Sequence, residues 1–213
     1  VPNTIEFGLS RDNLAAAVLD MALIPLFGIQ HSIMARRSFK SWLARFIPSA
    51  AERSTFMLGT ALVTFMLCLS WQPLPAIIWQ AENPLVANVL LGVGLAGWGL
   101  VLLASFLINH FDLFGLRQVW MYFCRQEYFP VPFKDVWLYR HIRHPIMTGV
   151  FIGIWVTPSM TAGHLFFALG MSIYILIGVY HEEKDLIREF GDKYRRYMND
   201  TGRFAPIWKS RKF

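Results

Sequence analysis

The sequence predicts an all-α integral membrane protein with about five transmembrane helices, a C-terminal helical hairpin and a cytoplasmic C-terminal helix. Two observations lead to this fold class. Of the 213 residues, 55% are hydrophobic and only 16% are charged, whereas charged residues make up about a quarter of an ordinary soluble domain. The apolar residues also gather in long runs, and about 20 consecutive apolar residues allow a helix to cross a bilayer.

Five runs are candidates for membrane spans. They cover residues 14–30, 55–71, 86–109, 145–157 and 163–180. The fourth run is shorter than the limit of about 17 residues, so it would have to borrow residues from its flanks. Because no linker or change of composition separates these runs, we expect a single domain over residues 1–213.

Basic residues predict the orientation in the membrane. The loops after the first and third runs and the region after residue 180 are rich in Lys and Arg, whereas residues 72–85 and 158–162 contain neither. Since basic loops stay in the cytoplasm, we expect the N-terminus outside and the C-terminus inside. The net charge of +6 then reflects contact of a multi-pass protein with the anionic headgroups of the lipid bilayer, and no nucleic acid is expected as a partner.

Features inside the apolar runs have structural interpretations. Residues 92–97 match the string GxGxxG, but no strand precedes them as a dinucleotide site requires, so we interpret them as a helix-packing surface. Asp20 lies in the first run, where a carboxylate is costly unless it is paired or faces a polar cavity; a functional and a structural role are both open. Cys68 and Cys124 fit neither a disulfide framework nor a four-ligand zinc site, so no metal is expected.

The first charged signature, residues 140–149, ends the loop before the fourth run. Arg143 and His144 stand directly before Pro145, and proline suits the first turn of a helix. The amide groups and the dipole at such a helix start, next to cationic side chains, would bind an anion such as a carboxylate. The alternative is a positive-inside boundary without a ligand.

The second charged signature begins at the end of the fifth run with Glu182 and Glu183. These carboxylates could hold hydroxyl groups or a cation of a ligand. The alternative is helix ion pairs with Lys184 or Arg188, worth about 0.5 kcal/mol or less. Because about 30 mostly apolar residues separate the two signatures, a hairpin can cross the bilayer and return, and we expect both signatures at the same membrane face.

His110 and Asp112 directly follow the third run, at the expected cytoplasmic interface. A histidine and an aspartate two residues apart can orient one another, or both can face a cavity. The alternative is an interfacial anchor with a helix stop at Gly115.

Residues 139–206 resemble the C-terminal half of the membrane methyltransferases of the isoprenylcysteine carboxyl methyltransferase type. The residues that match the patterns RHPxYxG and EExxLxxxFGxxYxxY, with a late proline, are Arg143, His144, Pro145, Gly149, Glu182, Glu183, Leu186, Phe190, Gly191, Tyr194, Tyr197 and Pro206. Met147 stands where that family has a tyrosine, so a hydroxyl contact to the cofactor is lost. The resemblance implies that residues 139–206 bind S-adenosylmethionine (SAM). The implied cofactor-binding residues are His144, Pro145, Met147, Gly149, Glu182, Glu183 and Tyr194.

Residues 30–36 and 110–118 are similar to the bacterial methanethiol S-methyltransferases and their NnrU-like relatives. This resemblance implies methyl transfer from SAM to methanethiol, which gives dimethyl sulfide, at the cytoplasmic face of the bacterial inner membrane. It also raises the expectation that His31 binds the substrate and that His110, oriented by Asp112, is the catalytic base. Arg143 would stabilise the thiolate or bind the cofactor carboxylate.

Two other interpretations stay open. The acceptor could be another small thiol, a lipid or an isoprenoid-linked group. A non-catalytic, NnrU-like membrane protein that handles haem or a quinone would instead use His31, His110, His141 and His144 as ligands. No protein partner is expected in any of these cases.

Overall fold

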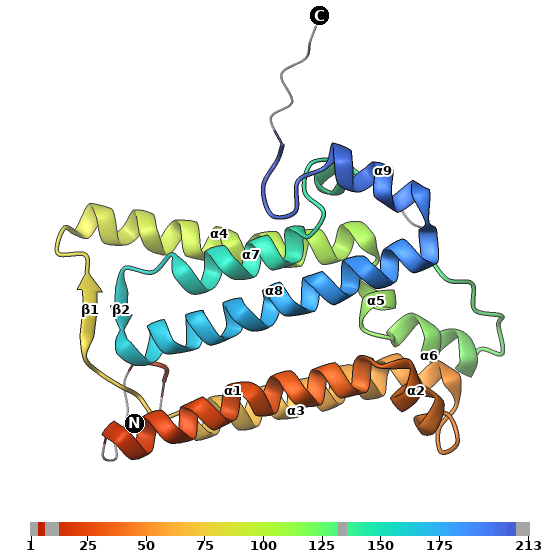
Figure 1. Ribbon diagram of the computed structural model, residues 1–213, viewed down its shortest axis with the longest axis horizontal. Helices are drawn as coiled ribbons and strands as arrows, with labels where there is room; N and C mark the ends of the chain where they lie inside the picture. The colour runs from red at the N-terminus through yellow and green to blue at the C-terminus, as the bar shows by residue number, and fades with distance from the viewer. Residues whose placement is uncertain (1–3, 7–12, 132–135, 208–213) are drawn as a thin grey trace, which may run out of the picture. The chain divides into compact units, whose positions relative to one another are not determined.

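The computed structural model describes residues 4–6, 13–131 and 136–207 (Figure 1); Arg11 and Lys134, two of the basic residues outside the apolar runs, lie outside these ranges. The long helices are α1 (Asn13–Ala35), α3 (Glu52–Ser70), α4 (Pro84–Ile108) and α8 (Ala162–Phe190). The shorter helices are α2 (Arg37–Leu43), α5 (His110–Leu113), α6 (Leu116–Phe123), α7 (Pro145–Trp155) and α9 (Asp192–Asp200). Single 3-10 turns cover Ser49–Ala51 and Trp137–Arg140, and the strands β1 (Ile77–Gln80) and β2 (Ser159–Thr161) pair antiparallel.

Four segments are helical, long and apolar enough to cross a membrane: Leu14–Ala35, Ser49–Ser70, Pro84–Ile108 and Ala162–Phe190. They correspond to four of the five expected spans, so the predicted class of all-α membrane protein is confirmed, with one small sheet in addition. Large apolar side chains on α3 such as Leu62, Phe65 and Leu69 are exposed. Such a surface suits lipid tails, which are as apolar as leucine.

The remaining expected span, residues 145–157, contains only a short helix. α7 has 11 residues and is therefore about 16 Å long, roughly half of the hydrocarbon thickness. After the helix, Val156 is extended, the chain bends at Pro158, and β2 follows.

Contacts within the chain divide it into two compact units. Unit 1 contains Val1–Glu82, Asn109–Val131 and Pro158–Met171, and unit 2 contains Asn83–Ile108, Pro132–Thr157 and Ser172–Phe213. Unit 1 therefore holds α1, α2, α3, α5, α6 and the sheet, unit 2 holds α4, α7 and α9, and α8 contributes to both units.

The core of unit 1 lies between α1 and α3. Leu23 and Ile24 are buried together with Leu67 and Trp71. Phe167, at the start of α8, packs edge-on against Trp71 with ring centroids 5.5 Å apart. This apolar cluster fixes the pairing of the first two long helices.

Asp20 is fully buried in unit 1. Its Oδ1 accepts a hydrogen bond of 3.0 Å from the backbone amide of Gln72, two residues after α3 ends. A buried acceptor that is satisfied by a backbone donor ties two segments together. Its Oδ2 is buried without a hydrogen-bond partner among the described residues, so this contact accounts for one of the two carboxylate oxygens and leaves both roles of Asp20 open.

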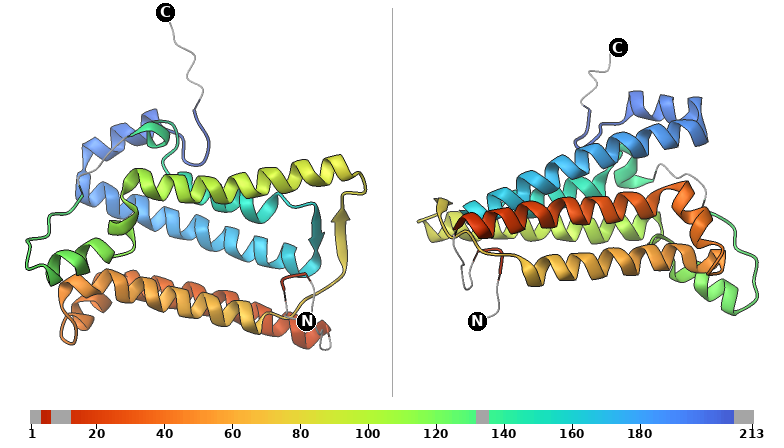
Figure 2. Two further views of the ribbon diagram at one scale, coloured as in Figure 1. Left: turned by 180° about the vertical axis from the view of Figure 1, so that it is seen from behind. Right: turned by 60° about the horizontal axis from the view of Figure 1, so that its bottom comes forward.

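In unit 2, α7 lies alongside α4, as the views of Figures 1 and 2 both show. The two helices approach at glycines: a Cβ atom added at Gly97 would lie 2.8 Å from the carbonyl oxygen of Gly149, closer than real Cβ contacts. The interpretation of residues 92–97 as a packing surface is therefore confirmed for Gly94 and Gly97, whereas a Cβ atom added at Gly92 would meet no neighbour within 4 Å. Trp155, at the end of α7, donates from Nε1 to Oγ of Ser172 on α8 at 2.9 Å, so α7 is held on both sides.

Candidate functional site

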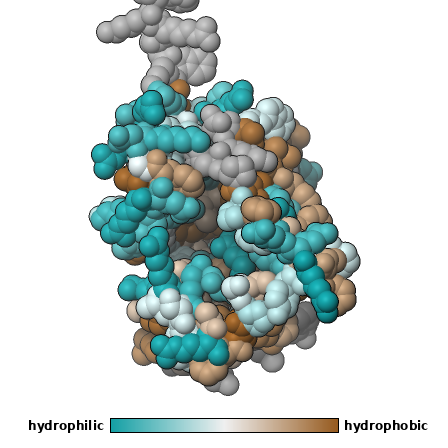
Figure 3. Space-filling model, turned by 90° about the vertical axis from the view of Figure 1, so that its right-hand side faces the viewer, coloured by the Kyte–Doolittle hydropathy of each residue, from teal (hydrophilic) through white to brown (hydrophobic). Residues whose placement is uncertain are grey.

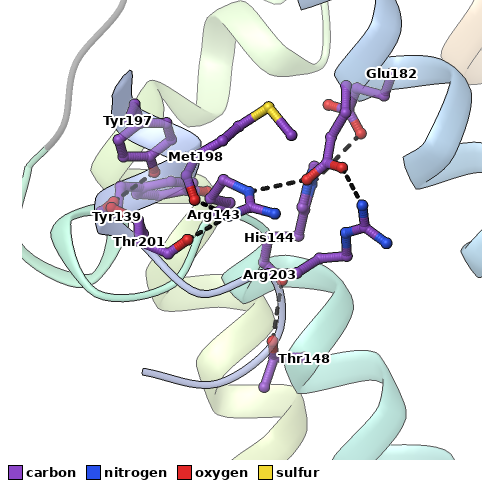
Figure 4. A network of polar contacts seen from close by, with 10 residues as sticks. Tyr139, Arg143, His144, Thr148, Glu182, Tyr197, Met198, Thr201 and Arg203 are labelled. Carbon is purple, nitrogen blue, oxygen red and sulfur yellow. Dashed lines mark hydrogen bonds and ion pairs between the residues drawn. The ribbon is translucent and has the colours of Figure 1, made fainter. Parts of the chain in front are cut away.

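The two charged signatures meet at one end of unit 2 (Figure 4). Arg143, just before α7, donates a hydrogen bond of 2.9 Å from Nε to Oε1 of Glu183 on α8. The two residues are 40 positions apart in the sequence, so the chain has turned back on itself as a hairpin. The prediction that the hairpin brings the signatures together is confirmed.

Glu183 is the centre of this cluster. Its side chain is only 4% exposed, and both carboxylate oxygens are engaged. Nε2 of His144 lies 3.2 Å from Oε1, and Nη2 of Arg203 donates to Oε2 at 2.5 Å. A buried carboxylate is stable only where cations and hydrogen bonds replace its lost hydration. Glu183 therefore anchors protein groups to one another.

Arg143 is buried to the same degree and has further acceptors. Its Nη1 donates to the carbonyl oxygen of Met198, at 2.9 Å, and to that of Thr201. These two carbonyls belong to the last turn of α9 and to the residue that follows it. Arg143 thus joins the start of α7, the helix α8 and the end of α9.

Residues 201–204, which we call the strap, run beside the loop that precedes α7. The backbone amides of Arg143 and His144 donate to the carbonyl oxygens of Gly202 and Arg203, at 2.8 and 3.1 Å. Because both contacts join backbone atoms, they fix the path of the chain independently of the side chains at these positions. The strap therefore lies across the start of α7.

Thr148 and Phe151 of α7 hold the far end of the strap. Oγ1 of Thr148 donates to the carbonyl oxygen of Phe204 at 2.9 Å. The ring of Phe204 packs edge-on against Phe151, with centroids 5.2 Å apart. Thr148, Arg203 and Phe204 were not among the expected site residues. Their only signal in the sequence is that a polar residue and a cation lie close to the two motifs.

Glu182 differs from its neighbour Glu183. Its side chain is 53% exposed, and its Oε2 lies 3.6 Å from Nδ1 of His144. The buried imidazole of His144 thus has a carboxylate beside each ring nitrogen. Hydrophilic side chains cover much of this end of unit 2 (Figure 3). Glu182 is therefore the carboxylate of the pair that solvent or a ligand reaches.

α7 starts as expected at Pro145, which is buried at the first helical position. The amide groups of this first turn have no acceptor within the helix, and they carry the positive end of the helix dipole. Met147 is half-buried in this turn. Gly149 is buried against Gly97 of α4, so close helix packing explains why this position is a glycine.

Tyr194 of α9 is buried beside the cluster. Burial and, next, the negative charge of Glu183 raise the pKa of its hydroxyl well above the ordinary value. Tyr194 therefore stays neutral over the physiological pH range. α9 is also fixed by Tyr197, whose hydroxyl donates to the carbonyl oxygen of Tyr139.

Asp112 lies in unit 1, within a second polar cluster. Its carboxylate accepts hydrogen bonds from Nη1 of Arg117, at 2.9 Å, and from the hydroxyl of Tyr128, at 3.2 Å. Its backbone amide donates to Oδ1 of Asn109, which caps α5. Burial and the charge of Asp112 raise the pKa of the Tyr128 hydroxyl.

His110 precedes Asp112 in α5, and its ring packs against Phe114 with centroids 4.6 Å apart. The predicted helix stop at Gly115 is confirmed, because this glycine adopts a φ of +78°. Its carbonyl oxygen accepts from Oγ of Ser54 at 3.0 Å, so the segment that carries His110 is fixed to the first turn of α3. The role of His110 as a base oriented by Asp112 stays a prediction.

His31 lies near the end of α1 in unit 1, where its ring contacts Phe27 and Phe56 at centroid distances of 5.8 and 4.8 Å. The predicted site residues thus form two groups. Unit 2 brings together Arg143, His144, Pro145, Met147, Gly149, Glu182, Glu183 and Tyr194, and unit 1 contains His31, His110 and Asp112. His141, a ligand in the haem or quinone alternative, is exposed whereas His144 is buried.

Known proteins identify the family. Methanethiol S-methyltransferase 1 of Bradyrhizobium diazoefficiens is 44% identical over 209 residues, which cover 98% of this chain and 73% of that protein. Methanethiol S-methyltransferase of Mycobacterium tuberculosis is 41% identical over 211 residues, 99% of this chain and 86% of that protein. Nurim of Rattus norvegicus is 28% identical over 188 residues, 83% of this chain and 70% of that protein. No family model and no solved structure matches. At these identities over nearly the whole sequence, the chain belongs to the methanethiol S-methyltransferase family.

Proposed function

We propose that this protein transfers a methyl group from SAM to methanethiol, which gives dimethyl sulfide, at the cytoplasmic face of a bacterial inner membrane. The observation that carries the proposal is the likeness, over nearly the full chain, to proteins named for this acceptor. The cluster at the end of unit 2 adds support, because it gathers the residues that resemble a SAM site.

The groups at the start of α7 fit SAM chemically. SAM carries a carboxylate, an ammonium group, ribose hydroxyls and a cationic sulfonium. The first turn of α7 offers amide donors and a positive dipole for the carboxylate. Glu182 offers a half-exposed carboxylate, beside His144, for hydroxyl groups or a cation. In this proposal Glu182 and the first turn of α7 hold SAM, whereas Glu183 and Arg143 keep that turn in place.

Bound SAM would supply a methyl carbon that its sulfonium makes electrophilic. The protein has to orient the acceptor, exclude water and help the thiol lose its proton, because the thiolate is the nucleophile. His110 stays the sequence-based prediction for the proton acceptor. His144 suits this task less well, because both of its ring nitrogens lie next to carboxylates.

A small apolar acceptor agrees with a membrane protein. Methanethiol partitions into lipid and can approach laterally between helices, whereas SAM is polar and comes from the cytosol. The basic residues of the loops after α1 and α4 and of the region after Tyr180 support a cytoplasmic location for the end of unit 2 that carries Glu183.

The test uses membranes that contain the full chain, supplied with SAM and methanethiol, and measures dimethyl sulfide in the headspace. Membranes without the protein are the control, and ethanethiol and an isoprenyl cysteine are offered as alternative acceptors. Dimethyl sulfide formation that depends on both SAM and the protein is expected. If SAM raises the unfolding temperature of the purified protein but only another acceptor is methylated, the methanethiol assignment is wrong. If SAM neither binds nor reacts, the whole proposal is wrong.

A further inference from the structure

Arg203 is a cation of the Glu183 cluster at a position that neither of the sequence motifs, RHPxYxG and EExxLxxxFGxxYxxY, includes. It belongs to the strap, and Nη2 donates to Oε2 of Glu183 at 2.5 Å. Its side chain is 43% exposed, whereas that of Arg143, which binds the other oxygen of Glu183, is 8% exposed. Arg143 is thus the inner partner of Glu183, and Arg203 is its more exposed partner.

The strap is held to the first turns of α7 by its backbone as well. The carbonyl oxygen of Arg203 accepts from the amide of His144, and that of Phe204 accepts from the hydroxyl of Thr148. At Gly202 a side chain would overlap the carbonyl oxygen of Ala205, so the chain turns tightly here. The side-chain contact of Arg203 and the backbone contact of the same residue therefore fix one short segment from two directions.

We propose that Arg203 is a positioning residue for SAM: its ion pair with Glu183 holds the strap across the start of α7 and thereby sets the affinity for the cofactor. This inference rests on the proposed function, since it concerns the site assigned there to SAM. The strap accepts the amide hydrogen of His144, and the ring of His144 lies next to Glu182. A strap released from Glu183 leaves His144 and the first turn of α7 less ordered.

The affinity for SAM falls when the strap is released, because binding must then order these groups as well as the ligand. The chemical step is affected far less, since Arg203 contacts neither reactant in this proposal. Loss of the Arg203–Glu183 ion pair should therefore raise KM for SAM and leave kcat nearly unchanged. A general loss of folding would not separate the two constants in this way.

The test compares Arg203→Gln with Arg203→Lys and with a matched control, Arg188→Gln. Arg188 is on the same end of α8 and pairs only with the exposed Asp185 in the described contacts. For Arg203→Gln we expect KM for SAM to rise about tenfold, with kcat changed less than about threefold. Arg203→Lys keeps the charge and restores most of the affinity, and Arg188→Gln behaves as wild type.

Hydrogen exchange in the protein without SAM gives a second readout. The amide of His144 should exchange faster in Arg203→Gln than in wild type, because its acceptor lies on the strap. An unchanged KM for SAM in Arg203→Gln would overturn the inference, and so would a fall in kcat and stability with KM unchanged, which is the pattern of a purely structural residue.

Two further measurements test the inference if Arg203→Gln cannot be purified or if the protein shows no methylation. If Arg203→Gln does not accumulate, Thr148→Val removes the hydroxyl that holds the far end of the strap; a raised KM for SAM supports the inference, and a wild-type KM overturns it. If the wild-type protein itself shows no SAM-dependent methylation, the proposed function fails. The exchange experiment, which uses no SAM, still shows whether Arg203 holds the strap.

Discussion

Two carboxylates of this protein, Glu183 in unit 2 and Asp112 in unit 1, each pair with an arginine, yet their surroundings differ. Glu183 is 4% exposed and binds Arg143 and Arg203, at sequence separations of 40 and 20. Asp112 is 18% exposed and binds Arg117, five residues further along the same segment. The first cluster joins distant parts of the chain, and the second stabilises one local turn.

The comparison shows that burial decides what an acid–arginine pair contributes. A partly exposed pair such as Asp112–Arg117 is screened by water and contributes less to stability. In a buried pair, each charge replaces the hydration that the other has lost. The loss of one member therefore leaves the other charged, buried and without hydration. We therefore expect the loss of Glu183 to destabilise the protein far more than the loss of Asp112, and the following experiments test this in order of decreasing effect.

Glu183→Gln should have the largest effect. Arg143 then loses its buried counter-ion, which costs about 3–5 kcal/mol of unfolding free energy, and methyl transfer becomes undetectable. Thermal unfolding of the purified protein in detergent measures the loss. The matched change in the other cluster, Asp112→Asn, should cost about 1 kcal/mol or less; an equal loss in both variants contradicts the comparison.

His110→Ala tests unit 1 by activity. If His110 is the base, the rate of dimethyl sulfide formation at saturating SAM falls by about 100-fold or more, while the unfolding temperature changes little, because the residue is only partly buried. The exposed His141 of unit 2 supplies the control, and His141→Ala should react at the wild-type rate. Wild-type activity in His110→Ala removes the assignment.

Glu182→Gln sharpens the contrast between neighbours. The side chain of Glu182 is 53% exposed, so the free energy of unfolding of this variant should stay within about 0.5 kcal/mol of wild type. KM for SAM should rise about tenfold, since one charged hydrogen-bond partner of the cofactor is lost. A variant that unfolds like Glu183→Gln, or that binds SAM as wild type does, contradicts the division of roles.

Hydrophobic runs predicted most of the fold because long helices in a membrane depend on little else. The exception is residues 145–157, where the helix ends at Trp155. Pro158 disfavours helical conformation in the residue before it, and the extended chain that follows pairs with β1. The run Ile77–Gln80 is rich in β-branched and aromatic side chains, which is typical of a strand.

The sequence predicted those parts of the candidate site whose residues belong to the two motifs. The pairing of Arg143 with Glu183 follows from a hairpin of the right length, whereas the strap depends on contacts to residues about 60 positions earlier. A four-residue segment without periodic pattern gives no local signal for such contacts. The sequence also did not predict which of Glu182 and Glu183 is buried. The two neighbours point to different faces of α8, and the rest of the fold decides which face is covered.

Tyr128→Phe should have the smallest effect on activity, and it tests whether the Asp112 cluster acts through its geometry. The hydroxyl of Tyr128 donates to Asp112 and accepts from Gln118, and its loss should cost about 1 kcal/mol. Since burial and Asp112 raise the pKa of this hydroxyl, it stays protonated below its ordinary pKa of about 10, so the cost is independent of pH between about 6 and 9. If Asp112 orients His110, kcat falls by about threefold with KM for SAM unchanged. A pH-dependent cost in that range, or a change in KM for SAM, would mean that Tyr128 acts on something other than Asp112.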